Sequence, residues 1–288
     1  MEKNNINFAF FGTSRFSVIV LDELKKNGFL PSLIITTEDK PKGRKLILTP
    51  PEVKDWTLKE NIPFIQPKTL KDSSVEKMIG ETIKNPDVFI VASYGKIIPE
   101  DILNIPKHKT LNVHPSLLPK LRGASPIQSS ILEENETGVT IIKLDKEMDH
   151  GPIVSQQKIK IENWPPYAMD LENILAEKGG QMLSEILPKW ISDEIKETPQ
   201  QDEEATFCRK IQKQDGEISL DGDPDLNLRK IRAYHLWPGA FTFFKHKEKT
   251  IRLVIKTAHI EEGKLILDRV VPEGKREMNF KEFERGLH

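Results

Sequence analysis

Unbroken apolar runs alternate with amphipathic stretches through the first two thirds of the chain. The runs at residues 6–11, 33–36 and 87–92 are short and mostly apolar, as in strands that are buried on both faces, and a further strand is expected at residues 111–114. Helical periodicity lies between them, with apolar residues three and four positions apart. Alternating strands and helices predict a parallel-rich sheet covered by helices on both sides. The pattern therefore predicts an α/β fold with a Rossmann-like domain.

Helical spacing is clearest in six stretches, and two more strands follow the fourth of them. The predicted helices are residues 16–24, 51–60, 73–84, 124–132, 167–190 and 226–233, and the two strands are 138–144 and 153–161. Ser14 stands directly before the first helix, where its hydroxyl could cap the first turn. The two later strands are expected to complete the sheet.

The pattern changes near residue 190. Residues 191–206 are rich in acids and almost free of apolar side chains, which is typical of a linker. Beyond them, short β-rich runs alternate with turn signals, as in a small OB-like β-barrel. We therefore expect a first domain at 1–190, a linker at 191–206 and a second domain at 207–288. Trp237 and Phe241 are expected in the core of the second domain.

Charge is distributed unevenly along a chain that is nearly neutral overall. The 288 residues carry a formal net charge of −1. Residues 208–288 hold 17 Lys and Arg against 13 Asp and Glu, a net +4, so the rest of the chain carries −5. A basic excess favours a polyanionic partner for the C-terminal part, although ordinary surface variation would give a similar count.

Several classes of protein are disfavoured by what the sequence contains. Cys208 is the only cysteine, so the chain forms no internal disulfide and no thiolate metal site. The seven histidines lack metal-ligand spacing, and we expect no metal. The first residues do not resemble a signal or transit peptide, and no run of 18 apolar residues suggests a membrane span. We expect a cytoplasmic monomer.

Candidate chemistry is concentrated in the strand expected at residues 111–114. Asn112 and His114 are two residues apart, so both side chains would leave a strand on the same face. Together with an acid such as Asp149, they could serve acyl transfer to an amine. The amide would donate to an oxyanion, the imidazole would move a proton and the carboxylate would orient it. A structural histidine would show the same spacing, so the motif alone leaves both readings open.

Two other segments stand out. Gly12, Thr13 and Ser14 follow the first strand and could line a cleft or simply begin the helix, but they lack the GxGxxG pattern, which argues against a nicotinamide oxidoreductase. Residues 37–54 contain five Lys or Arg and three prolines. A loop of this length in an α/β domain is usually functional or disordered.

These segments carry a resemblance to a known family. NVHPSLLP, RGASPIQ and ETGVTIIKLDKEMDHGPI resemble the folate-dependent formyltransferases. The D-x-P-x-G-R pattern at 39–44 and the later text KIQKQDGEI and IRAYHLWPGAF resemble the members that act on methionyl-tRNA. The resemblance implies transfer of a formyl group from 10-formyltetrahydrofolate to the α-amino group of methionyl-initiator-tRNA. It assigns the catalytic roles to Asn112, His114 and Asp149, makes Asp145 structural and gives His150 no role.

The resemblance also indicates where the two substrates bind. It places the folate at Ser116, Leu117, Leu118, Pro119, Tyr94 and Gly95, beyond the carboxyl ends of the strands. Contacts with tRNA phosphates are expected from Lys40, Lys42, Arg44, Lys45, Lys210, Lys213, Arg229, Lys230 and Arg232. Each of these cations, taken alone, could equally be a solvated surface residue.

Two alternatives stay open at this point. A formyltransferase for a small amine, such as an amino-sugar nucleotide, would share the catalytic residues, but the basic loop and the C-terminal text argue against it. A non-catalytic RNA-binding remnant would share the fold, but the retained Asn112, His114 and Asp149 argue against that.

Overall fold

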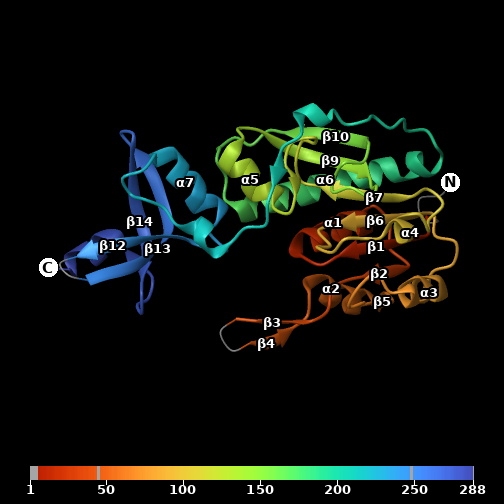
Figure 1. Ribbon diagram of the computed structural model, residues 1–288, viewed down its shortest axis with the longest axis horizontal. Helices are drawn as coiled ribbons and strands as arrows, with labels where there is room; N and C mark the ends of the chain where they lie inside the picture. Colours follow the sequence, from red (N-terminus) through yellow and green to blue (C-terminus); the bar gives the residue numbers. More distant parts are fainter. Residues whose placement is uncertain (1–5, 44–45, 247–248, 288) are drawn as a thin grey trace. The chain divides into compact units, whose positions relative to one another are not determined.

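The computed structural model describes residues 6–43, 46–246 and 249–287 (Figure 1). These residues form two compact units. Unit 1 comprises the described residues of Met1–Gly123, Thr137–Ile159 and Glu172–Phe207, and unit 2 those of Ala124–Glu136, Lys160–Leu171 and Cys208–His288. Two internal segments that a simple linear division would place in the first domain therefore belong to unit 2.

A seven-stranded sheet forms the centre of unit 1. Its order is β10-β9-β7-β6-β1-β2-β5. The bounds are β1 (Phe8–Gly12), β2 (Leu33–Ile35), β5 (Phe64–Ile65), β6 (Val88–Ala92), β7 (Thr110–His114), β9 (Thr137–Lys143) and β10 (Ile153–Ile159). The five strands from β7 to β5 are parallel, whereas β9 and β10 run antiparallel to their neighbours. The parallel-rich α/β prediction is confirmed.

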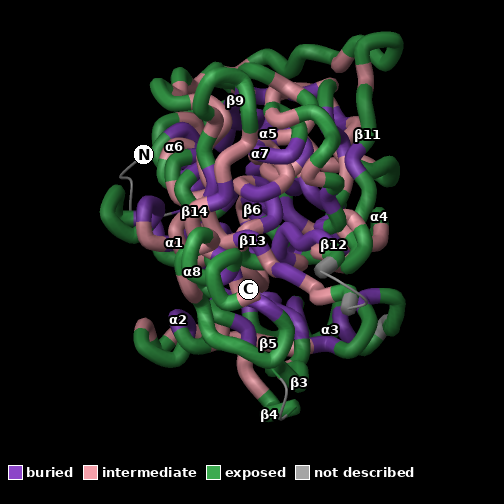
Figure 2. Tube along the Cα trace, turned by 90° about the vertical axis from the view of Figure 1, so that its left-hand side faces the viewer, coloured by how far each residue is buried: buried purple, intermediate pink, exposed green. Residues whose placement is uncertain are grey.

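The helices of this fold follow the predicted ones closely. They are α1 (Arg15–Lys26), α2 (Glu52–Glu60), α3 (Ser73–Thr82), the short α4 (Glu100–Leu103) that the sequence analysis did not predict, and α6 (Ala168–Ile191), whose first residues belong to unit 2. Strands β1, β6 and β7 are buried along their whole length, as Figure 2 shows for β6. Among the described residues, none of the helices is both long and apolar enough to cross a membrane.

The turn after β1 is held differently from the way the sequence suggested. The Ser14 side chain makes no cap for α1 and donates instead to Ser93 Oγ at 2.8 Å. Ser17 Oγ accepts from the Thr13 amide at 3.0 Å and donates to the Ala92 carbonyl at 2.6 Å. The ends of β1 and β6 are thereby joined at the carboxyl edge of the sheet, where parallel α/β folds bind ligands.

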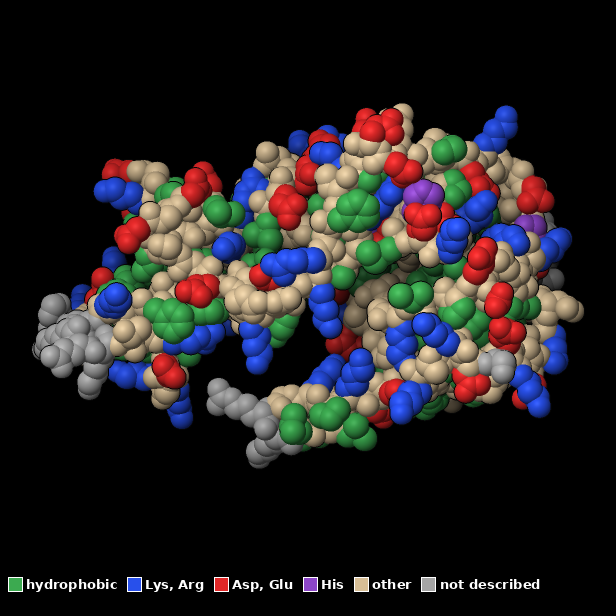
Figure 3. Space-filling model, viewed as in Figure 1, with side chains coloured by type: hydrophobic (Ala, Val, Ile, Leu, Met, Phe, Trp, Pro, Cys, Tyr) green, Lys and Arg blue, Asp and Glu red, His purple; other side chains and the backbone are tan. Residues whose placement is uncertain are grey.

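The basic segment at 37–54 is a hairpin and not the loop that we expected. Its strands are β3 (Lys40–Lys42) and β4 (Ile47–Thr49), which pair antiparallel. Asp39 anchors the base, because its carboxylate accepts from Lys54 Nζ and from Gln66 Nε2, each at 2.8 Å. The hairpin projects from unit 1 (Figure 1), and Figure 3 shows apolar side chains exposed on it with Lys and Arg side chains nearby.

Unit 2 contains a small antiparallel sheet with helices packed on it. The strand order is β12-β13-β14-β15. The elements are β12 (Ala240–His246), β13 (Lys249–Glu261), β14 (Lys264–Pro272), β15 (Met278–Asn279), α5 (Pro126–Glu133), α7 (Pro224–Ala233) and α8 (Phe280–Arg285). The remaining short elements of the two units are β8 (Arg122–Gly123), β11 (Phe207–Cys208) and the 3₁₀ turns η2 (Asp202–Glu204) and η3 (Lys213–Gly216). The predicted small β domain is confirmed, and α8 is a helix where a β-rich run was expected.

One of the two aromatic residues expected in the core of unit 2 lies at its surface. Trp237 is 50% exposed, because it lies in the turn between α7 and β12 and not in a strand. Phe241 is buried as predicted, with the Arg252 guanidinium 4.0 Å from its ring centroid. The core is formed by side chains such as Ile231, Leu253 and Val270, which are fully shielded.

Arg229 in α7 is a structural residue of unit 2. Its guanidinium donates to the carbonyls of Ile131 at 2.9 Å and Glu134 at 2.7 Å, and to Asn135 Oδ1. These carbonyls lie at the C-terminal end of α5, where helix carbonyls have no partner within the helix. A cation at this position also complements the helix dipole.

Replacing Arg229 with methionine should therefore loosen α5. We expect a loss of about 1–2 kcal/mol of local stability, as for hydrogen bonds from a charged group. Hydrogen exchange of the α5 amides measures this directly. Lys210→Met, at an exposed position, is the matched control and should leave the exchange unchanged. Native protection of α5 in Arg229→Met would show that these bonds do not stabilise the helix.

Candidate active site

Asn112 and His114 lie side by side on β7, in the middle of the sheet of unit 1. β7 pairs parallel with β6 and antiparallel with β9, so that Asn112 is opposite Val91 and Ile142, and His114 is opposite Thr140. Both side chains leave the same face, as a spacing of two requires. Asn112 is 8% and His114 4% exposed, so both polar groups are largely withdrawn from water.

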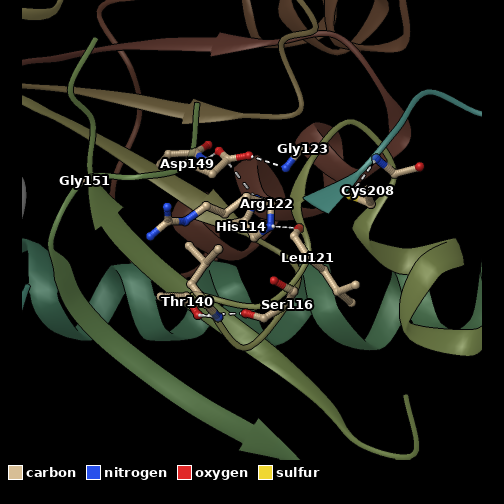
Figure 4. Close-up of polar contacts among 12 residues, drawn as sticks. His114, Ser116, Leu121, Arg122, Gly123, Thr140, Asp149, Gly151 and Cys208 are labelled. Carbon is tan, nitrogen blue, oxygen red and sulfur yellow. Dashed lines mark hydrogen bonds and ion pairs between the residues drawn. The ribbon is translucent and has the colours of Figure 1, made fainter. Parts of the chain in front are cut away.

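The turn that follows β9 brings Asp149 to them. Since β9 is antiparallel to β7, its last residue, Lys143, lies opposite Leu111, near the start of β7. The chain then returns across the face of β7. There, Asp149 Oδ1 lies 3.5 Å from Asn112 Nδ2 and 3.7 Å from His114 Nδ1 (Figure 4). The three residues that the sequence analysis proposed as catalytic are brought together in one cluster.

The turn is tightly constrained on both sides of Asp149. The Gly123 amide donates to Asp149 Oδ2 at 2.8 Å (Figure 4). Asp149 itself has a φ of 52°, in the left-handed region that non-glycine residues seldom adopt. At Gly151 a β-carbon would lie 1.8 Å from the Lys143 carbonyl oxygen, so only glycine allows the turn to pass so close to β9. The carboxylate is therefore held at a defined position.

The contacts of His114 determine which ring nitrogen is available for chemistry. His114 Nε2 lies 3.0 Å from the Leu121 carbonyl oxygen, which can only accept a hydrogen bond (Figure 4). The proton on Nε2 is thereby fixed. Nδ1, which faces Asp149, is the ring nitrogen that is not committed to a backbone acceptor. Leu121 has a φ of 61°, and its amide donates to Thr206 Oγ1 at 2.9 Å.

Asp145, the other acid of the turn, lies in a different environment. Its carboxylate accepts from His150 Nδ1 at 2.7 Å and from the Glu147 amide at 2.8 Å. The hydrogen bond to Asp145 raises the pKa of His150. Asp145 thus shapes the turn, as its predicted structural role requires, and His150 is bound to it.

The loop after β7, which the resemblance assigns to the folate, is rigid and internally bonded. Thr140 Oγ1 donates to the Ser116 carbonyl at 2.7 Å and accepts from the Leu118 amide at 3.1 Å. Gln156 Nε2 donates to the Leu118 carbonyl at 2.7 Å. Ser116 and Leu118 are buried, whereas Leu117 and Pro119 are half-buried. The apolar side chains of Leu117 and Pro119 are therefore better placed for a ligand than the backbone groups of Ser116 and Leu118.

The two other predicted folate residues differ in what they present. The Tyr94 ring packs edge-on against Phe11 in the core, with ring centroids 5.5 Å apart, and burial raises the pKa of its hydroxyl. Only its backbone reaches the edge of the sheet, where the Tyr94 carbonyl accepts from Thr13 Oγ1 at 2.9 Å. Gly95 is exposed, with a φ of 76° that favours glycine.

The expected linker is part of the site, which corrects the prediction for residues 191–206. Thr198 pairs with Ile153 through two backbone bonds of 2.8 Å. Gln200 Nε2 donates to the carbonyls of Asp149 and Gly151 at 2.9 and 2.7 Å. The acidic side chains made this segment look like a linker, but its backbone and its uncharged polar groups are bonded to unit 1. No periodic signal in the sequence marked Gln200.

The predicted phosphate-binding cations fall into three groups. Lys40 and Lys42 on β3, and Lys210 and Lys213, are exposed. Arg229, Lys230 and Arg232 bind protein carbonyls, and Arg232 also lies over the Tyr167 ring, 5.5 Å from its centroid. Arg44 and Lys45 lie outside the described residues. The helix α7 is therefore a weaker candidate for phosphate contact than its charge suggested.

Comparisons with known proteins agree with one another. The family model described as formyl transferase matches residues 4–187. The chain is 40% identical over 245 residues to the methionyl-tRNA formyltransferase of Sulfurihydrogenibium sp. (strain YO3AOP1), covering 84% of this chain and 78% of the relative. It is 36% identical over 302 residues to the methionyl-tRNA formyltransferase of Enterococcus faecalis, covering 97% and 95%.

A solved structure shows the same fold at lower identity. The N-formyltransferase from Helicobacter canadensis, in complex with folinic acid and dTDP-3-aminofucose, matches with a TM-score of 0.63 and 18% identity, covering 91% of this chain and 95% of that one. The fold is thus shared with an N-formyltransferase that was solved in complex with folinic acid and an amino-sugar nucleotide. The chain belongs to the formyl transferase family and, within it, to the methionyl-tRNA formyltransferases.

Proposed function

We propose that this protein transfers the formyl group of 10-formyltetrahydrofolate to the α-amino group of methionyl-initiator-tRNA. The observation that carries the proposal is the buried cluster of Asn112, His114 and Asp149 in a chain that aligns with a methionyl-tRNA formyltransferase over 95% of that relative's length. The products are formylmethionyl-tRNA, which serves translation initiation, and tetrahydrofolate. We expect the enzyme to work in the cytoplasm as a monomer without a metal.

The proposed mechanism is direct attack of the neutral amine on the formyl carbon. As the new C–N bond forms, negative charge develops on the formyl oxygen. Asn112 Nδ2 and a protonated His114 Nδ1 are the donors that would stabilise it. Asp149 would orient the imidazole and help to take the proton that the amine loses. The intermediate then releases its bond to N10 of the folate, and that nitrogen receives a proton.

The folate is proposed to bind beyond the carboxyl ends of β1, β6 and β7. Apolar side chains at Leu117 and Pro119, and the exposed backbone of Gly95, suit a flat ring system that needs dry faces and hydrogen bonds at its edges. Asn112 and His114 lie toward the end of β7, with Asp149 beside them from the turn after β9, and the formyl group would be presented there.

The tRNA is proposed to contact both units. The exposed lysines of β3, Lys40 and Lys42, would approach the acceptor end, and Lys210 and Lys213 would bind phosphates from the second domain. We keep residues 207–288 as the proposed tRNA-binding domain. Such contacts add affinity that falls steeply with salt.

The direct test is transfer of labelled formyl from 10-formyltetrahydrofolate to methionyl-initiator-tRNA. Uncharged tRNA and an amino-sugar nucleotide serve as parallel acceptors. We expect label on the charged tRNA alone, because only it combines a free α-amine with a polyanionic body. Label on the sugar would contradict the proposed acceptor and leave the chemistry of the cluster intact.

A folate-binding measurement completes this test. Absence of transfer together with absence of folate binding would favour the non-catalytic alternative. Absence of transfer with retained folate binding would indicate that the acceptor is wrong. The two measurements together therefore distinguish a protein without catalytic activity from an enzyme that uses a different acceptor.

A further inference from the structure

The side chain of Gln200 holds the backbone of the turn that carries Asp149. Its Nε2 donates to the Asp149 carbonyl at 2.9 Å and to the Gly151 carbonyl at 2.7 Å. These carbonyls belong to the residues on either side of His150, so one amide group spans the turn. The left-handed backbone of Asp149 costs energy, which these two bonds help to offset.

Arg122 fixes the direction in which the Gln200 amide points. Its Nε and Nη2 donate to Gln200 Oε1 at 3.1 and 2.8 Å, and Nη2 also donates to Asp202 Oδ1 at 2.8 Å. If the amide were turned over, its NH₂ group would face guanidinium donors and its oxygen would face two carbonyls. A guanidinium has no acceptor, so the opposite orientation loses all four bonds that the Gln200 side chain makes to Arg122 and to the two carbonyls.

The position of Arg122 in the chain connects it to two of the three catalytic candidates, His114 and Asp149. The residue before it, Leu121, accepts from His114, and the residue after it, Gly123, donates to the Asp149 carboxylate (Figure 4). Arg122 is only 4% exposed, and its guanidinium pairs with the carboxylate of Asp202, whose side chain is 62% exposed. That ion pair holds the pKa of Asp202 below its usual range.

We propose that Gln200 and Arg122 are positioning residues for Asp149, acting through its main chain while Gly123 holds its carboxylate. Neither side chain touches the reacting atoms. The inference rests on the proposed formyl transfer, because the role of Asp149 is defined by that reaction. It assigns a function in catalysis to a segment whose composition suggested a linker.

The test is a double-mutant cycle of Gln200→Glu and Asp149→Asn, measured by formyl transfer to methionyl-tRNA. Gln200→Glu keeps the acceptor for Arg122 but places a carboxylate oxygen against the two carbonyls. We expect kcat to fall about 10–100-fold, as for a misplaced catalytic group, with KM for both substrates within about threefold. In the Asp149→Asn background, Gln200→Glu should lower kcat by less than about twofold, because its effect on kcat passes through the Asp149 carboxylate.

Matched controls separate positioning from a loss of folding. Glu197→Gln removes an exposed ion pair with Lys143 in the same segment and should leave kcat unchanged. Melting temperatures identify any variant that does not fold. If Gln200→Glu does not fold, Gln200→Met takes its place, since it removes the amide N–H donors of Gln200 without adding charge. Arg122→Lys, which keeps the charge but not the planar pair of donors, should show the same dependence on Asp149.

The outcomes are distinct. An equal loss of kcat from Gln200→Glu in both backgrounds would overturn the proposal, because it would show a role independent of Asp149. Full activity of Gln200→Glu would overturn it as well. If the native enzyme itself transfers no formyl group to methionyl-tRNA, it is the proposed function that fails and not the positioning role.

Discussion

Replacing Asp149 with asparagine is expected to lower turnover by about 10³–10⁴-fold while the protein stays folded. The carboxylate lies 3.7 Å from His114 Nδ1 and accepts from the Gly123 amide. An asparagine fills the same space but cannot stabilise a proton on that nitrogen. Its amide group can also turn an N–H toward Nδ1, which stabilises the neutral imidazole and opposes the protonated form that the mechanism requires. Loss of the corresponding carboxylate in serine proteases has an effect of this size.

Single-turnover formyl transfer with saturating substrates measures this loss without a contribution from product release. The control is Glu147→Gln, an acid of the same turn whose side chain is exposed. We expect it to retain native turnover. A loss of less than tenfold in Asp149→Asn would show that the carboxylate is not needed for the chemical step, and the proposed role of Asp149 would then be abandoned.

Asn112→Ala should lower turnover by about 10²–10³-fold, with little change in folding. This is the cost of removing one preorganised donor to an oxyanion. Asn112 is 8% exposed, and the hydrogen bond that its side chain donates to Asp149, among the residues that the structure describes, is long at 3.5 Å. The side-chain amide of Asn112 can therefore also donate to a substrate oxygen. Its removal should raise the free energy of the transition state more than that of the folded protein.

The expected kinetic pattern is an equal loss in kcat and in kcat/KM for the folate, because the interaction forms only as charge develops. Asn104→Ala, an exposed asparagine at the end of α4, provides the comparison and should behave like the native enzyme. A rise in KM with unchanged kcat would mean that Asn112 binds the ground state, and the oxyanion role would be wrong.

Most strands of the large sheet, most helices and the shared face of Asn112 and His114 were predictable from the sequence pattern, and the family resemblance added Asp149. Periodicity determines elements such as β6 and α1 locally, and the spacing of Asn112 and His114 places both on one face of β7. The carboxyl ends of parallel strands meet at one edge, so the convergence of β1, β6 and β7 followed from the fold class.

Long-range partners were not predictable in the same way. Tyr94 looked like a ligand residue because it follows a strand, but its ring packs on Phe11 in the core. Arg229 looked like a phosphate contact because it is a cation in a basic region, but it binds the end of α5, nearly one hundred residues earlier. A side chain's charge is visible in a sequence, whereas its partner is known only once the chain has folded.

The bonds of residues 197–206 also limit how this protein can be divided or recombined. A shortened version that ends at residue 190 would lack Gln200 and Thr206, and with them the bonds that reach the Asp149 turn and Leu121. If this shortened version transferred the formyl group slowly, the loss could be wrongly attributed to the missing tRNA contacts of the C-terminal part. A chimera that exchanges the C-terminal part between relatives should place its junction after Thr206, so that the segment stays with the sheet it contacts.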